Sequence, residues 1–257
     1  MKLKILIVLN AVSLIFMIVI NVLANALPIN GKNTGELSAL YPNEFVPAGY
    51  TFSIWGLIYL SLVGFCIFQY GSIKNQSKRA VVEKIGWSFI ILNLLNCSWI
   101  FAWHYRLVSL SVLVMLAILF VLIHIHVKLP IPDSARSIQE KTWVQIPFSI
   151  YLGWIMTATI ANITAWLIDK HWYGDPLTQN LWTIIMISIA GVLSLYFLVG
   201  RKNLLIPCVT VWSIVGIITR QYWLNGFNSI ATTGAIVCAI LLVAVLMGLT
   251  KKSADNL

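Results

Sequence analysis

The chain has 257 residues, of which 60% are hydrophobic and only 10% are charged, and its mean hydropathy is +0.89. Soluble domains carry roughly 25% charged residues, so this composition excludes an ordinary soluble protein and indicates an all-α, polytopic membrane protein. The formal net charge is +9, but the basic residues are scattered over separate segments with no aromatic and basic groove, so we expect no nucleic-acid partner.

Eight apolar runs are long enough to cross a bilayer, for which a helix needs about 20 residues. They are separated by charged segments or by segments rich in Pro, Gly and Asn. In chain order the predicted transmembrane helices cover residues 5–26, 49–70, 85–103, 107–127, 142–168, 180–199, 203–219 and 230–250.

The distribution of Lys and Arg predicts the orientation of these helices. If the N-terminus is cytoplasmic, thirteen of the 17 Lys and Arg residues fall on the cytoplasmic side. The remaining four, expected in outer loops or at outer helix ends, are Lys32, Arg106, Lys170 and Arg220. Positive charge accumulates in short cytoplasmic loops, so we expect a multi-pass protein of the cell (inner) membrane with both termini in the cytoplasm.

Charge is missing from the interior of every predicted helix. The acidic residues all fall in predicted loops or at helix ends: Glu36, Glu44, Glu83, Asp133, Glu140, Asp169, Asp175 and Asp255. Proton-coupled transporters and ion pumps mark their pathways with ionisable residues, so these classes are disfavoured. His124 and His126 are two residues apart and point to different helix faces, and the four cysteines show no CxxC spacing. We therefore expect no metal site and no cofactor.

Aromatic and amide side chains are the chemistry that remains, and they recur at helical spacing on three predicted helices. The stripes are Phe52, Trp55, Tyr59 and Cys66 on the second helix, Asn93, Asn96, Trp99 and Trp103 on the third, and Tyr151, Trp154, Ala158 and Asn162 on the fifth. One interpretation is ordinary packing, because Asn and Thr hydrogen-bond between membrane helices and small residues let backbones approach. The other is a cavity that stacks a flat, largely apolar ligand.

At these stripes the sequence resembles the tryptophan-rich sensory protein family, also called the translocator protein or peripheral benzodiazepine receptor (TspO/MBR) family. Three segments match in the family's order: "PAGYTFSIWGLIY" from Pro47 to Tyr59, "LNCSW" from Leu95 to Trp99, and "YLGWIMTATIAN" from Tyr151 to Asn162. The sequence departs from the family at Ile150, where the family has Pro, and in a Phe52 to Trp55 interval one residue shorter.

The resemblance implies a five-helix TspO-like bundle over residues 1–168. It does not cover residues 169–257, where the apolar runs predict three additional transmembrane helices and a short cytoplasmic tail. It implies a pocket closed by the loop between the first two helices, with Pro47 and Gly49 shaping this lid. The residues implied to bind the ligand are Trp55, Tyr59, Asn96, Trp99, Tyr151, Trp154 and Ala158.

The function implied is that of an integral membrane binding protein, a sensor or carrier, for a flat hydrophobic ligand such as a porphyrin, another tetrapyrrole or a sterol-like molecule. A secondary transporter or permease for a small hydrophobic molecule is the alternative. We expect no catalytic residues, since no acid and base pair is visible, which disfavours a porphyrin-degrading enzyme. The lipid bilayer and the ligand are the expected partners, and Ala158 and Ala161 would allow close contact in a homodimer.

Overall fold

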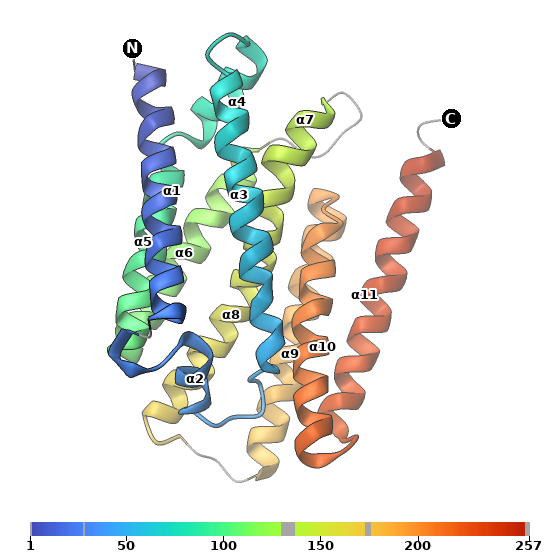
Figure 1. Cartoon of the computed structure of the whole chain (residues 1–257). Helices are drawn as coiled ribbons and strands as arrows, with labels where there is room; N and C mark the ends of the chain where they lie inside the picture. Colours follow the sequence, from blue (N-terminus) through green and yellow to red (C-terminus); the bar gives the residue numbers. More distant parts are fainter. Residues whose placement is uncertain (1, 28, 130–136, 173–175, 255–257) are drawn as a thin grey trace. The chain divides into compact units, whose positions relative to one another are not determined.

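The computed structural model describes residues 2–27, 29–129, 137–172 and 176–254 (Figure 1). Asp133, Arg136, Asp175 and Asp255, which the sequence analysis assigns to loops or to the chain end, lie outside these ranges. The helices are α1 (Lys2–Ala26), α2 (Thr34–Ala39), α3 (Ile54–Gly71), α4 (Gln76–Ile85), α5 (Ser88–His104), α6 (Val108–Lys128), α7 (Ile138–Glu140), α8 (Ile146–Asp169), α9 (Pro176–Arg201), α10 (Leu205–Asn225) and α11 (Ser229–Ala254).

Three short helical turns complete the described structure. The 3-10 turns η1 (Ile29–Gly31) and η2 (Gly49–Ser53) lie between α1 and α3, and η3 (Lys141–Gln145) is a π-helical turn that joins α7 to α8. The described residues form no β-strand. This confirms the all-α class predicted from the composition.

Within the described residues, seven helical segments are long and apolar enough to cross a membrane, or eight if the bent pair α4 and α5 counts as one span. The predicted span 85–103 corresponds to α5, which has 17 residues and meets α4 at an angle of 43°. Gly86 ends α4 with a φ of 52° and donates its N–H to the carbonyl of Val82. A glycine in this conformation stops a helix without steric cost. The chain is therefore a polytopic membrane protein with seven or eight spans.

Two helices of the structure extend past the predicted ends of their spans, which corrects the position expected for Arg220. The span predicted to end at residue 219 continues to Asn225, so Arg220 lies inside α10 and is half-buried. His104 is the last residue of α5 and is fully buried, with its Nδ1 atom 2.8 Å from the Ile100 carbonyl oxygen. In both cases the helix extends past the apolar run because the polar side chain finds partners within the protein.

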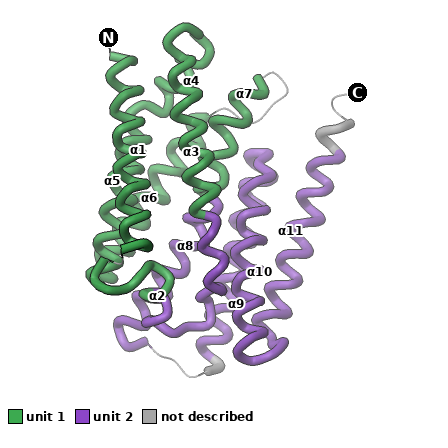
Figure 2. The backbone as a smooth tube through the Cα atoms, in the orientation of Figure 1, with its two compact units in different colours: residues 1–37, 55–152 green, residues 38–54, 153–257 purple. Residues whose placement is uncertain are grey.

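The chain divides into two compact units, coloured separately in Figure 2. Unit 1 comprises residues 1–37 and 55–152. In it α1 packs on α5, α5 packs on α6 and α4 packs on α6. Phe65, Phe89 and Phe148 fill its core with edge-to-face ring contacts, the centroids being 5.1 Å, 5.0 Å and 6.0 Å apart.

Unit 2 comprises residues 38–54 and 153–257. Helices α9, α10 and α11 pack against one another, and η2 packs on α10. Gly153 of α8 lies so close to α10 that an added Cβ would meet Val209 Cβ at 3.0 Å. These units group residues that lie close together in space, so the division into domains at residue 168 stays a prediction.

Candidate functional site

Three of the predicted ligand-binding aromatics form one cluster in unit 1. The Trp55 ring stacks on the Tyr59 ring, with centroids 5.5 Å apart and planes at 24°. The same indole meets the Tyr151 ring edge-on at 5.6 Å and 71°. Tyr151 is fully buried at the start of the "YLGWIMTATIAN" segment, while Trp55 and Tyr59 are half-buried. Two separate stripes of the sequence thus meet at one aromatic surface.

A chain of buried hydrogen bonds orients this cluster. Asn21 donates its side-chain N–H to the amide oxygen of Asn96 at 2.7 Å, and Asn96 donates to the Tyr151 hydroxyl at 2.9 Å. Asn21 and Asn96 are both almost fully buried. An amide that accepts from one neighbour and donates to another has a defined orientation, so the Asn96 side chain is held in place. Asn21 is one of several polar residues in the apolar run of α1, and the sequence did not single it out as part of the site.

The two tryptophans of the stripe on the third predicted helix lie near the end of α5. Trp99 and Trp103 stack at 5.8 Å with an interplanar angle of 12°, and both are buried. Trp103 donates its indole N–H to the Thr34 carbonyl at 3.4 Å, and Asn30 donates its amide to the His104 carbonyl at 3.0 Å. The first part of the loop between α1 and α3 is therefore attached to the end of α5.

The remaining predicted residues belong to unit 2. Trp154 is buried and meets the Phe52 ring edge-on at 5.8 Å and 79°. One turn further along α8, Thr157 shares a hydrogen bond of 3.0 Å with Ser213 of α10. Ala158 is half-buried beside it. This part of α8 thus combines an aromatic contact to the loop before α3 with ordinary polar packing between helices.

Burial excludes interface anchoring as the role of two of the predicted site tryptophans. A tryptophan that only anchors a helix in the interface is expected to face lipid or water. Trp99 and Trp154 are 7% and 4% exposed, respectively, so their rings are directed into the protein. The predicted site residues form two groups, with Trp55, Tyr59, Asn96, Trp99 and Tyr151 in unit 1 and Trp154, Ala158, Pro47 and Gly49 in unit 2.

The second part of the predicted lid, residues 38–54, is built into unit 2. Phe45 is 2% exposed and belongs to the hydrophobic core of this unit. The other members of this core are Ile160, Ile187, Ala190, Ile214, Ile217, Ile230 and Cys238. A phenylalanine at such a position anchors its segment through the hydrophobic effect.

Polar contacts with α10 hold the same segment along its length. Arg220 donates to the carbonyls of Asn43 at 3.4 Å and Val46 at 3.1 Å, and Gln221 donates to the carbonyl of Glu44 at 2.9 Å. Gln221 also bonds to the Glu44 carboxylate. These contacts satisfy backbone carbonyls that have no partner in a regular helix or sheet. Arg220 is therefore a structural anchor of the lid segment.

The end of the segment, at η2, lies directly against the middle of α10. Ala48 donates its backbone N–H to the Gly216 carbonyl at 2.9 Å, and Trp212 donates its indole N–H to the Thr51 carbonyl at 3.0 Å. Tyr50 packs edge-on against Trp212 at 5.5 Å. Trp212 lies within an apolar helix, and its hydrogen-bond partner is 161 residues away in the chain, so the pairing cannot be read from the sequence.

Pro47 is half-buried and Gly49 is exposed at the first residue of η2. A Cβ added at Gly49 would meet nothing within 4 Å. The glycine that the close packing does require is Gly216, where an added Cβ would overlap the Thr51 hydroxyl and come within 3.0 Å of its Cβ and Cγ2 atoms.

A Gly216→Ala variant is expected to weaken the attachment of η2, because Thr51 is short and buried and cannot move its side chain away. Overpacking of this kind costs about 1 to 3 kcal/mol. Hydrogen exchange of the backbone amides in residues 48–53 should become faster. Gly200→Ala in α9 is the matched control, since a Cβ there meets nothing within 4 Å; unchanged exchange in Gly216→Ala would contradict the close contact.

The family model described as TSPO-like protein matches residues 7–247. The match continues through α9 and α10 into α11, well past residue 168, where the resemblance seen in the sequence ended. No curated protein and no solved structure matches the chain.

Proposed function

Because the chain belongs to the family of TSPO-like proteins, we propose that it is a membrane binding protein, a sensor or carrier, whose ligand is flat and largely apolar. A porphyrin or another tetrapyrrole is the first candidate, and a sterol-like molecule is the second. The ligand would be bound by Trp55, Tyr59, Asn96, Trp99, Tyr151, Trp154 and Ala158. The protein would lie in the cell membrane with both termini in the cytoplasm.

The observation that supports this proposal best is the oriented aromatic cluster of unit 1. Ring faces of Trp and Tyr attract flat apolar molecules by stacking, and the half-buried Trp55 and Tyr59 rings are partly open to contact. The chain from Asn21 through Asn96 to Tyr151 keeps neutral hydrogen-bonding groups in a defined orientation beside these rings. Few, well-placed polar groups in an apolar surrounding are typical of small-molecule sites.

The lid segment suggests how access to such a ligand would be controlled. Phe52 touches Trp154, while Phe45, Ala48 and Thr51 of the same segment are attached to unit 2. We infer that α10 holds the segment with Pro47 and Gly49 in a fixed position within unit 2. The helices after residue 168 would then contribute to ligand binding by holding this lid.

The test is titration of the full-length protein in detergent with protoporphyrin, followed by the shift of the porphyrin absorbance band. Trp154→Ala and Asn96→Ala should each weaken binding, Trp154→Ala by about two- to tenfold, since a ring contact contributes about 0.5 to 1.5 kcal/mol. Trp87→Ala is the matched control, because Trp87 is 61% exposed next to α5.

Equal affinity in the wild type and in both site variants would contradict the assignment of these residues. Equal loss in Trp87→Ala would indicate unspecific partitioning of porphyrin into the detergent and protein surface. Uptake of a hydrophobic substrate into proteoliposomes that depends on a proton or sodium gradient would instead favour the transporter alternative. A chlorin-like or ring-opened product would favour an enzyme.

A further inference from the structure

A groove in unit 1, outside the aromatic cluster, combines an apolar wall with one positive charge. It has a volume of about 240 Å³ and is lined by Gly64, Ile67, Phe68, Gly71, Lys78, Gln139 and Trp143. These residues come from α3, from α4 and from the α7 to η3 region that precedes α8. The wall is mainly hydrocarbon and aromatic ring, and the charged group is the Lys78 ammonium.

Two glycines of α3 make this groove. Gly64 allows the Trp143 ring to pack directly on the helix backbone, because an added Cβ would overlap that ring. Gly71 lies two turns further along α3, and its lack of a side chain leaves space next to Lys78. A Cβ added at Gly71 would meet Lys78 Nζ at 3.1 Å and Cδ at 3.4 Å. The groove therefore runs along α3 between an indole and an ammonium group.

Lys78 has no counter-ion within the described residues. Its Nζ atom lies 5.1 Å from the centre of the Phe68 ring. The described ion pairs are Arg79 with Glu83 and Lys170 with Asp169. Lys78 is half-buried as a residue, and its ammonium lies over an aromatic ring. An anion that itself brings hydrocarbon stabilises such a group best, because both halves of the groove are then filled.

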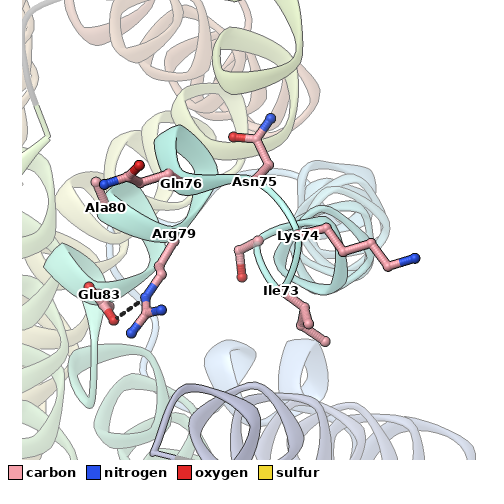
Figure 3. Close-up of a pocket in the computed structure, with 8 residues that line it drawn as sticks. Ile73, Lys74, Asn75, Gln76, Arg79, Ala80 and Glu83 are labelled. Carbon is pink, nitrogen blue, oxygen red and sulfur yellow. Dashed lines mark hydrogen bonds and ion pairs between the residues drawn. The ribbon is translucent and has the colours of Figure 1, made fainter.

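A neighbouring polar hollow lacks this combination. It has a volume of about 540 Å³ and lies around the residues that join α3 to α4 (Figure 3). Figure 3 shows the Arg79 guanidinium directed at the Glu83 carboxylate, 2.9 Å away, and the Lys74 side chain extending to the other side. The positive charge of Arg79 is already neutralised there, so Lys78 is the cation that borders apolar surface.

The groove lies where the headgroups of a bilayer are expected. Trp143 is 43% exposed, and partly exposed tryptophans concentrate at the interface between membrane and water. The segment from Lys74 to Lys84 is basic, and the positive-inside pattern assigns it to the cytoplasmic side. Anionic lipids of the cytoplasmic leaflet attract basic groups in such positions.

We propose that this groove binds an anionic phospholipid of the surrounding bilayer, with one acyl chain against Phe68, Ile67 and Trp143 and the phosphate on Lys78. The groove is separate from the aromatic cluster, so a negative result for lipid binding would leave the proposed function untouched. An anionic phospholipid differs from a neutral phospholipid in its charge, and it differs from free phosphate in its acyl chains.

Native mass spectrometry of the full-length protein, titrated in detergent with phosphatidylglycerol or phosphatidylcholine, tests the proposal. The wild type should prefer phosphatidylglycerol, and Lys78→Gln should lower that affinity about fivefold, as expected for one basic residue at a membrane surface. Gly71→Leu should lower the affinity for both lipids by filling the groove while keeping the charge. Lys84→Gln, on the same helix but outside the groove, should bind like the wild type.

Equal retention of the two lipids by the wild type would overturn the proposal, and so would an equal loss in Lys84→Gln, which would indicate a diffuse basic surface. Glycerophosphoglycerol, the headgroup without chains, should not compete at the same concentrations; if it competes fully, the apolar groove plays no part. Each variant must first show an unchanged thermal unfolding midpoint. If Gly71→Leu misfolds, the comparison of Lys78→Gln with Lys84→Gln still tests the proposal.

Discussion

Replacing Phe45 by alanine should loosen the lid segment, residues 38–54, from the rest of unit 2. It should lower the free energy of unfolding of unit 2 by about 3 to 5 kcal/mol. Phe45 is 2% exposed and packs with Ile160, Ile214 and Ile217 in the hydrophobic core of the unit. Truncation to alanine removes the ring and leaves a cavity that the surrounding helices can close only in part. It is the largest side chain by which residues 38–54 enter that core.

The measurement is hydrogen exchange of residues 38–54 together with thermal unfolding in detergent. We expect the backbone amides of the segment, including the Ala48 N–H that bonds to Gly216, to exchange faster than in the wild type. Phe120→Ala is the matched control, since Phe120 is 71% exposed on α6. Protection that stays unchanged in Phe45→Ala would show that the polar contacts with α10 hold the segment alone.

An Asn96→Leu variant should lose about 1 to 4 kcal/mol of stability, since it breaks two buried hydrogen bonds that contribute about 0.6 to 2 kcal/mol each in membrane proteins. Leucine has the same branched shape and the same number of side-chain heavy atoms as asparagine, so steric effects are small compared with the loss of partners. The Asn21 amide and the Tyr151 hydroxyl would both lose a partner inside the protein.

A double-mutant cycle with Tyr151→Phe isolates the bond between Asn96 and Tyr151. If the bond exists, the effects of the two single variants are not additive, because the double variant cannot lose the same bond twice. Ser98→Ala is the control on the same helix, as Ser98 is exposed and its hydroxyl bonds only to the Leu94 carbonyl. Additive effects would contradict the network from Asn21 to Tyr151.

Hydropathy predicted the transmembrane helices well because the bilayer imposes the same demand on every spanning segment. A helix that crosses hydrocarbon must be apolar over about 20 residues and must satisfy its backbone internally. Each predicted run corresponds to a helix of the structure, from α1 to α11. The predicted ends of the helices agree less well with the structure. In α10, for example, Arg220 and Gln221 remain helical because the lid segment supplies hydrogen-bond partners for their side chains.

Helical spacing also indicated which side chains share a face. The sequence singled out one pair of side chains on each of three helices: Trp55 and Tyr59, Asn96 and Trp99, and Tyr151 and Trp154. In the structure, each of these side chains makes a ring contact or a hydrogen bond in a buried or half-buried position. Periodicity gives the face of one helix, but it carries no information on which helix lies opposite. The pairing of Asn96 with Asn21 could therefore not be predicted.

The sequence by itself determined the class of the protein and the neutral, aromatic character of its candidate site, because composition and period are local properties. Only the tertiary structure decided what holds the lid. Phe45, Thr51, Trp212, Gly216 and Arg220 are separated by up to 175 residues in the chain (220 − 45), and each is ordinary in its own sequence context. Their role depends on contacts between distant segments, which form only when α10 and the lid segment pack together.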